Sequence, residues 1–199
     1  RLGSSNFNGL KKQIKNKNFV SVVSCSYIIP VKRLDLIIDI LSRLTIPFKW
    51  IHIGEGNLQK EIQEYAERKL KKENFLFLGS IENQFILNTY MEEDVDYLIN
   101  MSDSEGLPVS MMEAFSVGIP VISRNVGGVS EIVSNDCGLL LEKDFEFEFI
   151  TQKVEEILSA RLSNISLYCK MSEAALIKWK QKFDAEKNYN KFTEMLSGL

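Results

Sequence analysis

Cysteine, histidine and long apolar runs are scarce in this sequence, and each scarcity excludes a class of protein. The three cysteines, Cys25, Cys137 and Cys169, lie far apart and form no Cys-x-x-Cys pair. This spacing disfavours a disulfide framework or a zinc site and is typical of reduced thiols in a cytoplasmic protein. No stretch approaches the roughly 20 apolar residues of a membrane-spanning helix, and no signal-peptide pattern opens the chain. We therefore expect a soluble, cytoplasmic protein.

A basic excess is also absent, since the formal net charge is -3 and the pI is near 5.4. Surfaces that grip nucleic acid or anionic lipid through bulk electrostatics usually carry such an excess, so we expect no nucleic-acid partner. Any anionic ligand must therefore be bound by a few local groups rather than by an overall positive charge. The 199 residues, 45% hydrophobic and 26% charged, suffice for one large domain or two small ones. Because the chain begins at Arg1 rather than methionine, we expect it to be a piece of a longer protein.

Short apolar runs alternate with amphipathic stretches through most of the chain. The runs cover residues 19–28, 48–54, 74–80, 95–102, 120–124 and 138–142. Apolar strands separated by single helices predict a parallel sheet covered on both faces, the Rossmann-like doubly wound α/β class. Residues 1–18, which are polar and lysine-rich, are interpreted as a linker, and the pattern after about residue 145 is helical only. In such sheets ligands bind beyond the carboxyl ends of the strands.

Two glutamates follow one of these strands, in the segment SEGLPVSMMEAFSVGIPVIS at 104–123. Glu105 lies at the carboxyl end of the predicted strand, and Pro108 is suited to the first turn of the next helix. The amides of Gly106 and Leu107 would then lie at a helix amino terminus, where N–H groups and the helix dipole favour phosphate. Glu105 and Glu113 would accept hydrogen bonds from sugar hydroxyls. The alternative remains open that Glu105 caps the helix and Glu113 lies on a solvated face.

Other polar residues are weighed in the same way. His52 falls inside an apolar strand and is interpreted as an interior residue. Asp94 and Asp96 precede a strand, away from the ligand end, so we predict no metal there. The Gly-x-Gly at 54–56 and the Gly-Gly at 127–128 either approach a phosphate through their amides or only turn the chain. Lys32 and Arg33 stand at a helix start, where the dipole disfavours cations, which favours a bound anion there.

Several linked motifs resemble the retaining family 4 glycosyltransferases. The segment 104–123 followed by NVGGVSEIV resembles that family's E-x7-E region. IIPVKRLDLIIDIL, WIHIGEGNLQKEIQ and NFLFLGSI resemble, in order, the segment after its first donor-domain strand, its Gly-x-Gly turn and its next strand and loop. The resemblance covers about residues 19–142. It implies a GT-B fold, of which residues 19–172 would be the nucleotide-sugar-binding domain and 173–199 a crossover helix that packs poorly alone.

The resemblance also implies roles for single residues. Glu113 matches the glutamate that binds the ribose hydroxyls, and Glu105 the one that contacts the transferred sugar. Lys32 matches the lysine that neutralises the departing diphosphate. The family's preceding Gly-Arg pair is replaced by Ser26 and Tyr27, so its second cation is missing. Either Arg33 substitutes for it, or the donor is held differently, or activity is weak.

The backbone of two loops completes the implied site. The amides of Gly106 and Leu107 would approach the diphosphate, and Ser80 and Ile81 would meet the base. The donor would be UDP- or GDP-linked, with no other cofactor and no metal. An amino-terminal acceptor domain, absent from this chain, would complete the enzyme and could bring it to the inner face of the membrane. The implied setting is polysaccharide or surface-glycan assembly.

Two other functions stay open. One is a related GT-B enzyme such as an epimerase or a phosphorylase. The other is a non-catalytic nucleotide-sugar-binding or regulatory module, which Tyr27 makes credible. A dinucleotide-dependent dehydrogenase is disfavoured, because the loop after the first strand reads YIIPVK and lacks the glycines that let a pyrophosphate approach.

Overall fold

A six-stranded parallel sheet forms the centre of the molecule. The computed structural model describes residues 3–6, 9, 12–144 and 146–197. The strands are β1 (Val20–Cys25), β2 (Phe48–Ile53), β3 (Phe75–Phe77), β4 (Tyr97–Asn100), β5 (Val121–Arg124) and β6 (Gly138–Leu141). They lie in the order β3-β2-β1-β4-β5-β6, and every recorded pairing is parallel. The predicted doubly wound α/β class is confirmed.

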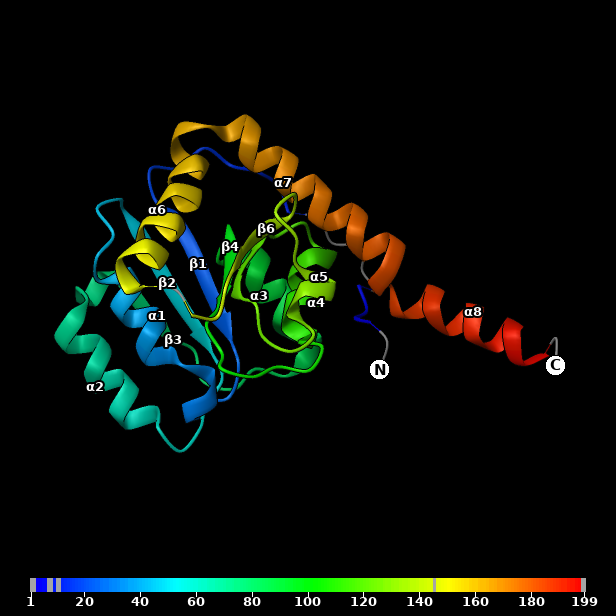
Figure 1. Cartoon of the computed structure of the whole chain (residues 1–199), viewed down its shortest axis with the longest axis horizontal. Coiled ribbons are helices and arrows are strands. Elements are labelled where there is room, and N and C mark those ends of the chain that lie inside the picture. The colour runs from blue at the N-terminus through cyan, green and yellow to red at the C-terminus, as the bar shows by residue number, and fades with distance from the viewer. Residues whose placement is uncertain (1–2, 7–8, 10–11, 145, 198–199) are drawn as a thin grey trace.

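Helices cover both faces of this sheet (Figure 1). One face carries α1 (Leu34–Leu41), α2 (Gln59–Lys69) and α6 (Phe147–Ser163); the other carries α3 (Ile86–Glu92), α4 (Val109–Ser116) and α5 (Val129–Ile132). Short 3-10 turns, η1 (Pro30–Lys32), η2 (Lys72–Asn74) and η3 (Asn83–Phe85), lie in the connections. Two hydrophobic clusters result, one on each side of the sheet. Their separation explains why the strands read as continuous apolar runs.

Strand β1 shows this double burial residue by residue. Val20 and Val22 belong to the cluster beneath α1 and α6, whereas Val23 belongs to the cluster beneath α3 and α4. Successive strand side chains point to opposite faces, so a strand buried on both faces needs an apolar residue at nearly every position. β1 is therefore the centre of the fold, with β2 on one side and β4 on the other.

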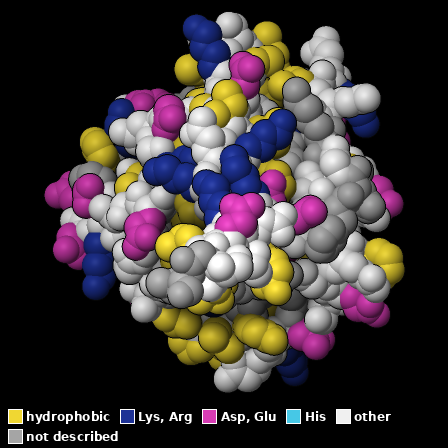
Figure 2. All heavy atoms as spheres, turned by 90° about the vertical axis from the view of Figure 1, so that its right-hand side faces the viewer, with side chains coloured by type: hydrophobic (Ala, Val, Ile, Leu, Met, Phe, Trp, Pro, Cys, Tyr) yellow, Lys and Arg dark blue, Asp and Glu magenta, His cyan; other side chains and the backbone are white. Residues whose placement is uncertain are grey.

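The carboxyl-terminal helices divide into a packed part and an exposed part. Helix α7 (Ile165–Lys178) and the π-helical turn Trp179–Phe183 contribute Ala175 and Trp179 to the core, so residue 173, the expected start of a crossover helix, lies inside packed α7. Helix α8 (Ala185–Ser197) has no buried residue and extends away from the domain (Figure 1). Figure 2 shows Lys and Arg side chains gathered near the middle of the face on that side of the molecule, with apolar side chains around them.

Some of the described residues in the segment before β1, which was predicted to be a linker, contact the domain. Ser4 bridges to Asp184, and the Trp179 indole donates to the Ser4 hydroxyl at 2.9 Å. Lys12 is buried and forms an ion pair with Asp96 just before β4. Among the described residues, no helix is long and apolar enough to cross a bilayer.

Candidate donor-binding site

The loops after β1 and β4 meet at the point where the strand order reverses. β1 continues into η1 and α1 on one face of the sheet, whereas β4 continues into α4 on the other. The two connections diverge, and ligands of doubly wound sheets bind in the crevice that such a divergence opens at the carboxyl ends of the strands. The two loops supply Lys32 and Glu105.

Lys32 and Glu105 are in direct contact across this crevice. The Lys32 Nζ lies 2.8 Å from Glu105 Oε1. Pro30 begins η1, where a missing N–H has no effect on helix hydrogen bonding, and the turn ends at Lys32. The Glu105 side chain is only 8% exposed. Burial raises its pKa, but hydrogen bonds from Lys32, Ser102 and Asn100 outweigh burial and lower it, so Glu105 is a carboxylate at neutral pH.

Asn100 and Ser102, neither of which was expected in the site from the sequence, hold Glu105. Asn100 Nδ2 donates to Glu105 Oε1 at 2.9 Å, and Ser102 Oγ donates to the same oxygen at 2.6 Å. Both residues are buried, and the Ser102 N–H donates to Asn100 Oδ1. A polar residue at the end of the apolar run YLIN was the available signal, because a buried amide requires a hydrogen-bond partner.

The amides of Gly106 and Leu107 lie just before α4. Pro108 was expected in the first turn of the helix. It is instead the N-cap residue, and the helix begins one residue later, at Val109. Within the described part of the chain, neither the Gly106 nor the Leu107 N–H has a recorded acceptor. Both residues are exposed, so these N–H groups are available to an anionic ligand near Lys32 and Glu105.

The glycine pair at 127–128 supports that loop from behind. Gly127 has φ of +53°, and a Cβ atom there would lie 1.8 Å from the Glu105 carbonyl oxygen. The Gly128 N–H donates to the Gly106 carbonyl at 3.1 Å. Glycine is needed here for close packing of the chain against the Glu105–Gly106 backbone, because any side chain at 127 would displace it.

The Gly-x-Gly turn after β2 plays a similar part beneath the β1 loop. A Cβ atom on Gly54 would lie 1.9 Å from the Ser26 carbonyl oxygen, and the residue has φ of +134°. The Ile28 N–H donates to the Glu55 carbonyl at 3.0 Å. This turn therefore fixes the loop that leads to Lys32.

Glu113 lies on α4 but is not recorded in contact with Lys32 or Glu105. It is 7% exposed, and its Oε1 accepts a hydrogen bond from Asn83 Nδ2 at 2.8 Å. Asn83 begins η3, in the connection after β3. Burial and then the nearby charge of Glu113 raise the pKa of the Cys25 thiol to about 11. The carboxylate therefore faces the ends of β1 and β3, where Asn83 positions it; the sequence analysis did not identify this partner.

Arg33 belongs to a different group of charges. Its φ of +50° is unusual for a residue other than glycine, and its guanidinium pairs with Asp35 at 3.1 Å and Asp103 at 3.4 Å. Tyr27, at the position of the expected arginine, is 71% exposed. Among the described residues, Lys32 is the one cation paired with Glu105.

Ser80 and Ile81 follow β3 on the same edge of the sheet. Ser80 is exposed, and Ile81 packs against the cluster beneath α3 and α4. The Gly79 carbonyl accepts a hydrogen bond from the Gly54 N–H at 2.8 Å, which ties this loop to the turn after β2. Ser80 and Ile81 thus lie beside the other loops, and the contact of this connection with Glu113 is made further along, by Asn83.

A family model described as "Glycosyl transferases group 1" matches residues 7–177. The chain belongs to the group 1 glycosyl transferases. Two matching relatives of this group 1 chain are an O-antigen biosynthesis glycosyltransferase, WbnH, of Escherichia coli and a Vi polysaccharide biosynthesis protein, VipC/TviE, of Salmonella typhi. WbnH is 35% identical over 111 residues, covering 56% of this chain and 30% of its own length. VipC/TviE is 27% identical over 135 residues, covering 67% of this chain and 20% of its own length.

Solved glycosyltransferase structures share the fold of this group 1 chain. A lipopolysaccharide outer core galactosyltransferase, WaaB, has a TM-score of 0.76 at 18% identity and covers 95% of this chain. The Anabaena protein Alr3699/HepE, solved with UDP and glucose, has a TM-score of 0.75 at 22% identity and covers 92%. The chain spans 52% of the first and 49% of the second, about half of each. The Rossmann-like fold of GT-B glycosyltransferases is confirmed.

Proposed function

We propose that this group 1 glycosyl transferase chain is the donor-binding half of a retaining enzyme. The enzyme would move a hexose from a UDP- or GDP-linked donor to an acceptor in polysaccharide or surface-glycan assembly. The observation that carries the proposal is the contact of Lys32 with Glu105 at the switch point of the sheet, beside the amides of Gly106 and Leu107. The names of the O-antigen and Vi polysaccharide relatives support the setting.

Each side chain has a role in this proposal. Glu105, kept ionised by its donors, accepts hydrogen bonds from the transferred sugar. Lys32 neutralises the charge that develops on the diphosphate as the bond to the sugar breaks, and this lowers the barrier because the charge is greatest in the transition state. The Gly106 and Leu107 N–H groups bind the same diphosphate.

The nucleoside would occupy the neighbouring edge of the sheet. Glu113 accepts hydrogen bonds from the two ribose hydroxyls, which requires it to exchange or share its bond with Asn83. Ser80 and Ile81 would meet the base through backbone groups. The donor is the substrate, and the proposal includes no resident metal.

An acceptor-binding domain would complete the cleft. We propose that it is supplied outside these residues and that any peripheral association with the cytoplasmic face of a membrane occurs through it. Chemistry between two halves requires closure around both substrates, so the present chain alone should bind donor weakly and turn nothing over.

One observation favours a second function, a non-catalytic nucleotide-sugar-binding module. Arg33 is held by Asp35 and Asp103, and Tyr27 is exposed where the family has arginine. Lys32 would then face the diphosphate without a second cation. Transfer or hydrolysis of donor by the chain joined to its acceptor domain, lost in Lys32→Met, separates the enzyme from the binding module.

Calorimetry with UDP, GDP and uridine tests donor binding directly. We expect UDP or GDP to bind. Glu113→Gln should weaken binding by about tenfold, since glutamine still accepts hydrogen bonds but a neutral acceptor is worth about 1–1.5 kcal/mol less than a charged one. Lys32→Met should weaken UDP but leave uridine unchanged. Glu67→Gln, at an exposed position of α2 on the other face of the sheet, is the control and should have no effect. If neither diphosphate binds at millimolar concentration, the proposed function is wrong.

A further inference from the structure

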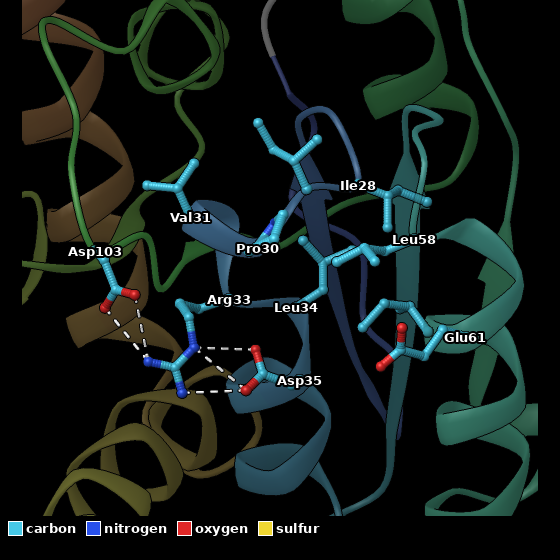
Figure 3. Close-up of a pocket in the computed structure, with 11 residues that line it drawn as sticks. Ile28, Pro30, Val31, Arg33, Leu34, Asp35, Leu58, Glu61 and Asp103 are labelled. Carbon is cyan, nitrogen blue, oxygen red and sulfur yellow. Dashed lines mark hydrogen bonds and ion pairs between the residues drawn. The ribbon is translucent and has the colours of Figure 1, made fainter.

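A second cavity lies beside the candidate donor site, and Figure 3 shows the residues that line it. Its volume is about 600 Å³, within the roughly 300–1,000 Å³ of small-molecule pockets. It opens between η1, the start of α1 and the start of α2, with one wall from the loop after β4. In Figure 3 the Arg33 guanidinium lies between the Asp35 and Asp103 carboxylates at one side of the cavity.

The floor of the cavity is apolar and its rim is charged. Val31 and Leu58 are partly exposed and supply apolar surface to the opening, and buried Ile62 supports it from below. Figure 3 shows Glu61 on the far side of the cavity from Asp103. Carboxylates accept several hydrogen bonds each, and an arginine adds fixed donors. Apolar contact below with convergent acceptors and donors above is the pattern that recognises a polyhydroxyl ring.

The charge of the rim decides which ligands fit. Asp35, Glu61 and Asp103 carry three negative charges against the one positive charge of Arg33. Arg124 reaches Asp103 from the protein interior, through a hydrogen bond, and still leaves the group net negative. A phosphate or a nucleotide would meet net repulsion, so the cavity does not suit the donor's diphosphate. A neutral ligand with many hydroxyls meets no such penalty.

Two short stretches of chain place the cavity next to the candidate donor site. Arg33 directly follows Lys32, so η1 is a wall shared by both. Asp103 precedes Glu105 by two residues, which separates their Cα atoms by at most about 7 Å. A ligand in the cavity would therefore lie near the position at which Glu105 would contact the transferred hexose.

We propose that this cavity binds a neutral hexose unit of a saccharide acceptor, with its ring over Val31 and Leu58 and its hydroxyls on Asp35, Glu61 and Asp103. The inference rests on the proposed function, because it places the acceptor chain next to the donor. It assigns part of acceptor recognition to the donor-binding half.

Methyl NMR of the present chain, labelled at Ile, Leu and Val, tests this. Maltose, lactose and N,N′-diacetylchitobiose, each titrated to tens of millimolar, are the probes. We expect at least one of them to shift the Ile28, Leu58 and Ile62 methyls while the core residue Ile122 stays unchanged. Glu61→Gln should weaken that binding by about tenfold. Exposed Glu64, about one turn further along α2 and absent from the cavity lining, gives the control: Glu64→Gln should leave binding unchanged.

UDP in the same samples keeps the two proposals separate. Shifts of the Leu107 methyls with UDP, but no shift of Ile28, Leu58 or Ile62 with any of the three saccharides, would overturn the acceptor inference and leave donor binding intact. Saccharide shifts without any UDP response would overturn the proposed function instead. Equal binding to the Glu61→Gln and Glu64→Gln variants would also overturn the inference, because the rim would then play no part.

Discussion

Replacing Asp96 with asparagine tests how the segment before β1 is attached to the sheet. Asp96 is fully buried at the start of β4, and its carboxylate oxygens lie 2.6 Å from Lys12 Nζ, 2.7 Å from Lys17 Nζ and 2.7 Å from Arg161 Nε. Burial raises its pKa, but the charges of Lys12 and Lys17 outweigh burial and lower it. One carboxylate therefore joins the amino-terminal segment, β4 and α6.

The size of the effect follows from what the substitution leaves behind. Asparagine keeps the volume but removes the charge, and a buried ion pair that loses one partner typically costs about 3–5 kcal/mol. Burial already lowers the pKa of Lys12 to about 8 in spite of Asp96. Without Asp96 this amine would lose its proton more easily, which limits the penalty. We therefore expect a loss near the lower end, about 3 kcal/mol of a total stability of about 5–15 kcal/mol.

Urea denaturation followed by circular dichroism at pH 7 measures this loss. Asp94→Asn is the matched control, because Asp94 pairs with the same two lysines at 3.3–3.6 Å but its side chain is 20% exposed. Asparagine also tolerates the φ of +48° found there. We expect the control to lose less than about 1 kcal/mol. A loss of that small size in Asp96→Asn, or an equal loss in both variants, would refute the reasoning.

Three further predictions concern single residues. Gly127→Ala should destabilise the chain by about 2–4 kcal/mol in urea titrations, since the cost of a positive φ adds to the cost of overlap between the new Cβ and Glu105. Gly106→Ala is the control, because its Cβ would meet open space, and it should lose under about 1 kcal/mol. Burial lowers the pKa of His52 to about 4, so between about pH 6.5 and 4 the unfolded chain binds a proton that the folded chain does not. The free energy of unfolding should therefore fall by up to about 3 kcal/mol as the pH drops through that window. In His52→Gln this part of the pH dependence should be absent. The Cys25 thiol, with its pKa raised to about 11, should react with iodoacetamide at pH 8 more slowly than free cysteine by at least about tenfold, and equal rates would contradict the burial argument.

The sheet could be predicted from the sequence because strands that are buried on both faces appear there as short apolar runs. Each of the six apolar runs contains one strand, and the helical patterns between them include α1, α2, α3 and α4. The strand ends were less predictable. The run 95–102 supplies only Tyr97–Asn100 to β4, because Asp96 turns to its three cations and Met101 begins the loop. Side-chain chemistry, rather than apolar character, sets those limits.

The meeting of Lys32 and Glu105 could also be predicted, whereas the direction of Arg33 could not. Neighbouring parallel strands end side by side at the same edge of the sheet before their connections diverge, so a lysine soon after β1 and a glutamate soon after β4 lie close together. Arg33 is adjacent to Lys32 in sequence, but the left-handed backbone at this residue turns its side chain to Asp35 and Asp103. No periodicity encodes that conformation. The Asp96 network is similarly hidden, since its cations at 12, 17 and 161 are brought together only by the fold.

Asn100 and Ser102 explain how a resting contact between Lys32 and Glu105 is compatible with the proposed function. A diphosphate carries more negative charge than a carboxylate and would draw the Lys32 ammonium away from Glu105 Oε1. A carboxylate only 8% exposed would then be left buried without a counter-ion, which is strongly unfavourable. The amide of Asn100 and the hydroxyl of Ser102, at 2.9 Å and 2.6 Å, remain on the same oxygen and keep it satisfied. In the proposed function, the Lys32 ammonium can therefore pair with the donor's diphosphate while Glu105 stays ionised and fixed in place, facing the sugar.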